Sequence, residues 1–281
     1  MVNGLTRFNK MRQVEAVGTG LPTQILTNTI SGAMFAGAGL VDPLAAVTLG
    51  SASILGAMGG VRLGNSMNEH ESRGVMGAFM VALAPLMALS PLLQEDGDAD
   101  NDCRYGEAQT EAAAEARAAT ARPATADHWT AHWQPERLWE EANARGPAAL
   151  SQLLGLGTLV GVISGTLGVG ATPVMIAYLA LNRGPNRVDE YKACVGTALV
   201  AVTPNVTTGS ISHAMMGSMQ WRMVPILGVG TAIGALCGSS IALYIPNTLM
   251  QQVFAAFCGI TGFAMLRKAP FLKRLLQKTI K

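Results

Sequence analysis

The longest charge-free stretch of the chain, residues 150–182, constrains its fold the most. It has 33 residues without Asp, Glu, Lys or Arg, whereas one membrane-spanning helix needs roughly 20 apolar residues. Its middle, from Gly165 to Pro173, reads GTLGVGATP. Glycine and proline weaken or break a helical hydrogen-bond ladder, so the stretch predicts an apolar segment that is broken at its centre. Membrane proteins use such breaks where bare backbone faces a solute.

The composition agrees with a membrane protein. Of the 281 residues, 49% are hydrophobic and 14% are charged, whereas a soluble domain carries about 25% charged residues. Most of the charge lies at the two termini and in residues 94–147. We therefore expect an all-α polytopic, integral membrane protein in which the lipid bilayer is the main surrounding partner.

The apolar segments define the domain organisation. Six further segments have the length needed to cross a bilayer: residues 14–39, 43–64, 74–93, 190–216, 222–245 and 248–268. We expect a first transmembrane repeat over residues 1–93, a polar extramembrane linker over 94–147, a second transmembrane repeat over 148–268 and a basic tail over 269–281.

An internal repeat relates the two halves. Shifting the chain by 178 residues, without a gap, gives 16 identities over positions 14–90. Thr19 then aligns with Thr197, and Gly39 with Gly217. Many secondary transporters are built from such repeats, with the solute site between them. The segment 150–182 has no counterpart ahead of residue 14, so we expect the chain to be an N-terminally truncated form.

The distribution of basic residues favours one topology. If residues 150–182 cross the membrane once, the repeats are parallel and the basic residues near helix ends divide 8 against 7. If the stretch enters and returns as two half-helices, the repeats are inverted and the division is 12 against 3. Basic residues gather on the cytoplasmic side. We therefore predict inverted repeats, a re-entrant or discontinuous helix, cytoplasmic termini and a linker on the opposite side.

The glycine break is the first candidate for a binding site. A half-helix starting near Pro173 would present free backbone N–H groups and the positive end of its dipole to an anion. Gly168 and Gly170 would let the backbone approach a ligand closely, and Thr172 would cap the helix. The alternative is that these glycines serve only for tight helix packing.

Polar residues in two other apolar segments would complete the site. Thr197 and Asn205 lie in segment 190–216, where a proline before Asn205 predicts a kink near mid-membrane. Thr19, Thr23 and Asn28 lie in segment 14–39 and would form the facing wall. Hydroxyls and amides can donate to an oxyanion, but threonine in a membrane helix also commonly bonds its own backbone.

The sequence predicts no cofactor and no metal site. The four cysteines form no CxxC pair, and His128 and His132, although four residues apart, lack a third ligand nearby. Basic and aromatic residues are not interleaved as in nucleic-acid-binding proteins. Whether the chain forms a homo-oligomer is left open.

The residues around the glycine break are similar to a known family. Gly161-Val-Ile-Ser-Gly165-Thr-Leu-Gly168-Val-Gly170-Ala-Thr-Pro173 resembles the glycine-rich first helix of the sulfite exporter TauE/SafE family of membrane permeases. The Val-Gly-Thr start of both repeats and the short turns at 39–42 and 217–220 also resemble that family. Two departures stand out: the family's consecutive glycines are replaced here by Gly170-Ala171-Thr172, and the first copy of the motif helix is absent.

The resemblance implies a permease rather than an enzyme. Such proteins are thought to carry small anions such as sulfite and organosulfonates by alternating access coupled to H⁺ or Na⁺. Two alternatives remain: a non-transporting or truncated membrane protein with a scaffold role, and, more remotely, an intramembrane serine protease using Ser164 and His213. The protease would need a Gly-x-Ser-Gly motif, and here the upstream glycine is Gly161, one position too far.

Overall fold

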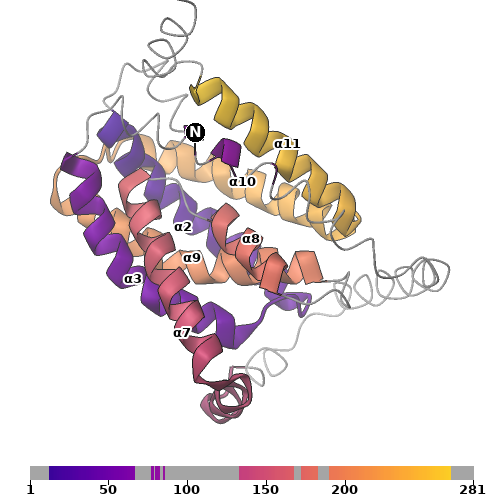
Figure 1. Ribbon diagram of the computed structural model, residues 1–281. Coiled ribbons are helices and arrows are strands. Elements are labelled where there is room, and N and C mark those ends of the chain that lie inside the picture. The colour runs from indigo at the N-terminus through magenta and orange to yellow at the C-terminus, as the bar shows by residue number, and fades with distance from the viewer. Residues whose placement is uncertain are drawn as a thin grey trace, which may run out of the picture.

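The computed structural model describes residues 13–66, 77–78, 80–82, 85, 133–167, 172–182 and 190–266. This part of the chain is helical and contains no strand, which confirms the predicted all-α fold (Figure 1). Its long helices are α2 (Gln13–Gly37), α3 (Pro43–Ser66), α7 (Pro135–Leu167), α8 (Thr172–Asn182), α9 (Glu190–Met215), α10 (Met223–Tyr244) and α11 (Asn247–Leu266).

Within the described residues, four helical stretches are long and apolar enough to cross a membrane. They are Pro43–Gly64 in α3, Ala142–Thr166 in α7, Tyr191–Met215 in α9 and Met223–Tyr244 in α10. The chain is therefore an integral membrane protein by the character of its helices. Helix α2 has the length but not the apolarity, because Thr23, Gln24 and Asn28 lie in its middle.

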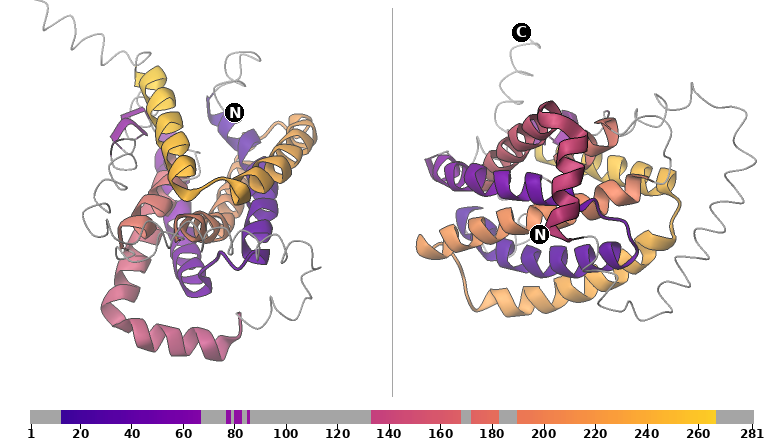
Figure 2. Two further views of the ribbon diagram at one scale, coloured as in Figure 1. Left: turned by 90° about the vertical axis from the view of Figure 1, so that its right-hand side faces the viewer. Right: turned by 90° about the horizontal axis from the view of Figure 1, so that it is seen from below.

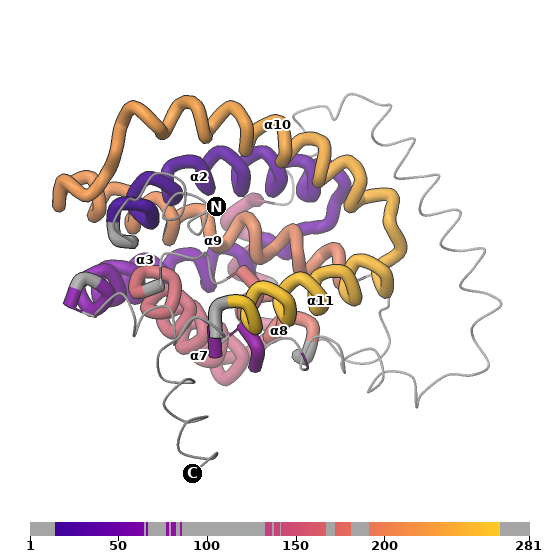
Figure 3. The backbone as a smooth tube through the Cα atoms, turned by 90° about the horizontal axis from the view of Figure 1, so that it is seen from above, coloured from indigo at the N-terminus to yellow at the C-terminus, as the bar shows by residue number. Residues whose placement is uncertain are grey.

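Helices α2 and α9 form the centre of the bundle and run in opposite directions. Gly18, near the start of α2, packs against the carbonyl of Ser218 just beyond α9, and Gly196, near the start of α9, packs against Leu40 just beyond α2. Helix α3 packs against α9, and helix α10 packs against α2 (Figure 3). Because α2 belongs to the first half of the chain and α9 to the second, this central pair joins the two halves.

Helices α3 and α7 run in the same direction at very short range. Gly56 of α3 packs on Gly161 of α7, and Gly64 packs on Thr166 further along. A Cβ atom added at Gly157 would lie 2.6 Å from the carbonyl oxygen of Leu49, closer than real Cβ atoms approach. Glycine on both helices therefore permits backbone-to-backbone packing, as in other membrane helix pairs.

Helix α7 bends sharply near its start. Gly146 has φ 78° and ψ 164°, which separates residues 135–145 from the apolar remainder of the helix, and Figure 2 shows the two parts as an L. Arg145 ends the first arm, and its Nη2 lies 2.6 Å from Oδ2 of Asp42, at the start of α3. This polar arm lies within the segment 94–147 that was predicted to be extramembrane.

Two short turns link the helices of each half and share one geometry. Gly39 and Gly217 have φ 73° and 68°, a left-handed conformation that glycine adopts without steric cost. The N–H of Gly39 donates to Ala36 O at 2.9 Å, and that of Gly217 donates to the O of Ala214 at 3.1 Å. Both pairs differ by 178 residues, the offset of the sequence repeat.

Candidate functional site

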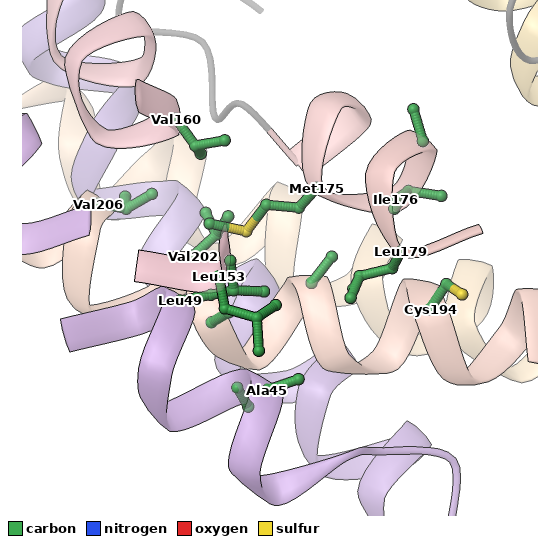
Figure 4. Packing of buried hydrophobic residues seen from close by; sticks show 14 of the residues in the cluster. Ala45, Leu49, Leu153, Val160, Met175, Ile176, Leu179, Cys194, Val202 and Val206 are labelled. Carbon is green, nitrogen blue, oxygen red and sulfur yellow. The ribbon is translucent and has the colours of Figure 1, made fainter. Parts of the chain in front are cut away.

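The short helix α8 packs in the centre of the molecule, on α9. Met175 lies beside Val202, and Leu179 lies toward Cys194 (Figure 4). Helix α8 therefore runs opposite to α9. Its 11 residues span about 16 Å, roughly half of a bilayer core.

The path of the chain supports the predicted entry and return of residues 150–182. Helix α9 runs parallel to α3, since Gly50 packs on Ala201 while Asp42, eight residues earlier, bonds to Thr197. Helix α7 also runs parallel to α3, so α7 and α9 begin at the same end of the bundle, and α8 leads back towards it. The re-entrant form and the inverted repeats stay predictions, because residues 168–171, with Gly168 and Gly170, lie outside the described residues.

The direction of α8 relative to α9 relates the start of α8 to Asn205. Thr172 precedes Met175 on α8, and Asn205 follows Val202 on α9, so the N-terminal end of α8 lies toward the part of α9 that carries Asn205. Thr172 is the first residue of α8, where backbone N–H groups are free of helical partners. The N-terminus of α8 and Asn205 are thus the two candidate donor groups at this end of the α8–α9 pair.

Asn205 of α9, like Tyr191 on the same helix, buries a side-chain polar atom that has no hydrogen-bond partner among the described residues. Its side chain is 1% exposed, and its Nδ2 has no hydrogen-bond partner among the residues that the structure describes. An amide buried without a partner costs roughly 1–3 kcal/mol. The neighbouring hydroxyls differ, because Thr203 and Thr208 donate to the backbone oxygens of Leu199 and Pro204. Asn205 therefore retains a donor that a ligand could use.

Thr19 and Thr197, the repeat-matched pair, are fully buried and engaged with the fold. Thr197 Oγ1 accepts from the N–H of Asp42 at 2.9 Å. Thr19 Oγ1 accepts from the N–H of Gln220 at 3.1 Å and donates to Glu15 O at 2.7 Å. In the structure these hydroxyls bind the backbone of the turns that contain Asp42 and Gln220. Their predicted solute binding stays a prediction.

Thr23 and Asn28 lie on α2, the helix that carries the predicted facing wall of the site. Thr23 is fully buried, and its hydroxyl donates to Gly20 O at 2.7 Å. Asn28 is buried near the middle of α2, where Gly32 packs on Val200 of α9. Both residues are buried on α2, and their predicted part in a solute site stays a prediction.

Three other polar contacts had not been singled out from the sequence. Ser31 of α2 accepts from Ser239 of α10 at 2.7 Å between their hydroxyl oxygens. Asp42 pairs with Arg145 and also accepts the N–H of Ala45 at 3.0 Å, which caps α3. The sequence signal for the first was a hydroxyl residue on each of two apolar helices, because a buried hydroxyl needs a hydrogen-bond partner.

His213 lies in the last turn of α9, where its imidazole Nδ1 lies 2.9 Å from Ser218 Oγ. Ser218 also donates to the backbone oxygen of His213. The imidazole is thus held by the turn that follows its own helix. No contact with Ser164 of α7 accompanies it in the described part of the chain, so the protease alternative gains no support.

Comparison with known proteins places this bundle in a family. A family model for the sulfite exporter TauE/SafE matches residues 4–265, which covers nearly the whole helical region. The chain belongs to the sulfite exporter TauE/SafE family. This confirms the resemblance drawn from the glycine-rich motif and makes it a member of a family of membrane transporters.

Curated relatives support the family assignment over shorter segments. A probable membrane transporter protein of Xylella fastidiosa (strain 9a5c) is 33% identical over 118 residues, which cover 41% of this chain and 42% of that protein. The probable membrane transporter protein YdhB of Bacillus subtilis is 27% identical over 119 residues, covering 42% and 47%. The matched part thus spans less than half the length of these relatives. No solved structure matches the chain significantly.

Proposed function

We propose that this TauE/SafE family protein is a permease that carries a small sulfur oxyanion, sulfite or an organosulfonate, across a membrane by alternating access. The observation that carries the proposal is the buried amide of Asn205, whose side chain is 1% exposed. Among the described residues its Nδ2 has no hydrogen-bond partner, and the N-terminal end of α8, where backbone N–H groups are free of helical partners, lies toward the same part of α9.

The chemistry of the buried polar residues favours an anion. Within the described residues, the buried polar side chains are Ser, Thr, Asn, Gln and one His, without any Asp, Glu, Lys or Arg. Neutral donors can replace part of the hydration shell of an oxyanion, and the positive end of the α8 dipole supplies partial charge. A site without a fixed cation binds an anion weakly enough to release it, which transport requires.

Within this proposal the residues have separate roles. Asn205 and Thr172 donate to the oxyanion, and Gly168 and Gly170 bring the backbone N–H groups of the break close to it. Thr23 and Asn28 form the opposite wall, and Thr19 and Thr197 hold the helix ends in place. Movement of the anion is coupled to H⁺ or Na⁺, which offsets its charge during the crossing.

Flux measurements in proteoliposomes test the proposal. The full chain is reconstituted, and sulfite uptake is followed under an imposed H⁺ or Na⁺ gradient. Asn205→Leu removes one hydrogen bond to a charged ligand, worth about 1.5–3 kcal/mol, and we expect flux to fall about tenfold or more. Absence of sulfite and organosulfonate flux under both gradients would refute the permease assignment for this chain.

The matched control is Thr203→Val, two residues from Asn205 on the same helix. The Thr203 hydroxyl donates only locally, to Leu199 O at 2.9 Å, so its loss should leave flux unchanged. Equal losses in both variants would point to a general defect in α9 rather than to a site at Asn205.

A further inference from the structure

The first part of α7, residues 135–145, has an apolar stripe, and we call these residues the α7 arm. Apolar residues recur in it at positions i, i+3, i+4 and i+7, a spacing that puts them on one face of an α-helix. They are Pro135, Leu138, Trp139 and Ala142. Glu136, Glu140 and Asn143 lie outside this stripe and are exposed. The α7 arm is therefore an amphipathic helix.

The protein covers only part of the apolar stripe. Leu138 and Ala142 are half-buried, whereas the side chain of Trp139, next to Leu138 in the stripe, is 70% exposed. An indole ring is mostly apolar, so its burial is favourable, while its N–H group still needs a polar partner. In the part of the chain that the structure describes, the stripe thus ends in a large apolar ring that faces outward.

The α7 arm is held crosswise at one end of the bundle. The backbone of Gly146 turns it away from the apolar remainder of α7 (Figure 2). Trp133, just before the arm, packs against the hydrophobic core, and Arg145 at its other end pairs with Asp42 at the start of α3. Helices α3 and α7 both begin at this end, so the arm lies where two membrane spans start.

A second exposed tryptophan lies at the opposite end. Trp221 is in the turn between α9 and α10, and its side chain is 66% exposed. Because α7 and α9 begin at the same end of the bundle, the turn that follows α9 lies at the other end. Tryptophan is enriched at both membrane–water interfaces, where the ring meets the acyl chains and the N–H group meets the headgroups. Trp139 and Trp221 thus lie at the two levels expected for these interfaces.

We propose that the α7 arm is an interfacial helix that lies flat on the membrane and inserts Trp139 at the level of the lipid headgroups. Its apolar stripe faces the acyl chains, and its polar residues face water. The arm, PERLWEEANAR, has three Glu and two Arg. Burial of apolar surface therefore drives its binding, and attraction to anionic lipid does not. Because Arg145 pairs with Asp42, this anchor holds the starts of α3 and α7 at one depth, whatever solute the protein carries.

Depth-dependent fluorescence quenching tests the proposal. The full chain with Trp139 as its single tryptophan, the other three being replaced by Phe, is reconstituted in phosphatidylcholine vesicles whose acyl chains carry bromine at one depth. We expect a loss of Trp139 fluorescence that is greatest with bromine nearest the headgroups. Replacing part of the phosphatidylcholine by anionic phosphatidylglycerol should leave this loss unchanged.

The matched control moves the single tryptophan to the opposite side of the arm. Ala144 is exposed, and its helical position is opposite the apolar stripe. Combined with Trp139→Phe, Ala144→Trp should therefore show little quenching at any depth. A second measurement retains the native tryptophans: Trp139→Phe in the otherwise unaltered chain should reduce the quenching by shallow bromine.

Four results would overturn the proposal. Equal quenching of tryptophan at positions 139 and 144 would mean that the arm has no fixed orientation on lipid. Greatest quenching by the deepest bromine would mean that the arm enters the membrane core. Blue-shifted emission of Trp139 without quenching would mean that protein, for example a second copy of the chain, covers it. Quenching that appears only with phosphatidylglycerol would mean that lipid charge recruits the arm.

Discussion

Gln220 donates its backbone N–H to the hydroxyl of Thr19 at 3.1 Å, across 201 residues of sequence. The same arrangement occurs once more, because Asp42 donates to Thr197 at 2.9 Å. In each case a threonine near the start of one central helix closes the turn that follows the other. The buried threonines that attract attention in the sequence thus serve first to join the two halves of the bundle.

Removing either hydroxyl should destabilise the protein by a similar amount. Thr19→Val and Thr197→Val each leave a backbone N–H without its acceptor, and we expect each to lower the free energy of unfolding by roughly 1–3 kcal/mol. Denaturant unfolding of the purified protein in micelles measures the change. Thr→Ser at each position should restore most of it, and an effect confined to one of the two threonines would contradict the paired roles.

Asn205→Leu should separate stability from transport. The substitution removes a buried amide whose Nδ2 has no partner in the described part of the chain, so we expect the free energy of unfolding to rise by roughly 1–3 kcal/mol. Flux should fall at the same time. Lower stability in Asn205→Leu would indicate that the amide supports the fold and would weaken its assignment to the ligand.

Alanine at two repeat-matched glycines should act with opposite sign. Gly60→Ala places a methyl group against the backbone of Val162, and we expect a loss of about 1–3 kcal/mol from overpacking. Gly238→Ala meets open space and should stabilise the isolated chain by up to about 1 kcal/mol through helix propensity. Thermal unfolding of both variants at one detergent concentration makes the comparison, and equal effects would show that α3 and α10 share one environment.

The ion pair between Asp42 and Arg145 should contribute less to the free energy of unfolding than the helix cap that Asp42 provides for α3. The Arg145 side chain is 37% exposed, so Arg145→Ala should cost at most about 1 kcal/mol and less at high salt. Asp42→Ala also removes the acceptor for the N–H of Ala45 and should cost about 1 kcal/mol more. Unfolding measured at low and high salt distinguishes the two, because only the ionic part responds.

The sequence predicted the elements well and the partners of their side chains poorly. The lengths of the apolar segments predicted the helices. The 178-residue offset predicted that the turns at Gly39 and Gly217 would share a geometry. Periodicity and composition do not reveal which backbone N–H faces a hydroxyl, so the bonds of Thr19 and Thr197 could not be foreseen. Asn205 was singled out because the proline before it predicts a kink that places its amide near mid-membrane.

The boundary at residue 147 shows a second limit. Charge separated the polar residues 135–145 from the apolar stretch, as in the structure, where Gly146 bends the helix between them. That the two parts form one continuous element, with Arg145 held by Asp42, depends on a contact across 103 residues. Long-range contacts of this kind leave no local pattern in a single sequence.

The threonine that closes the first turn also sets an order of events during synthesis. The hydrogen bond from the N–H of Asp42 to Thr197 forms only after Thr197 has been synthesised. Thr197 follows 155 residues later, which takes roughly 8 to 30 s at ribosomal speed. Until then the turn between α2 and α3 lacks its acceptor, and α2 lacks its central neighbour. The first half of the bundle therefore matures only after α9 has entered the membrane, and a ribosome that stalls before residue 190 leaves a first half that cannot finish folding alone.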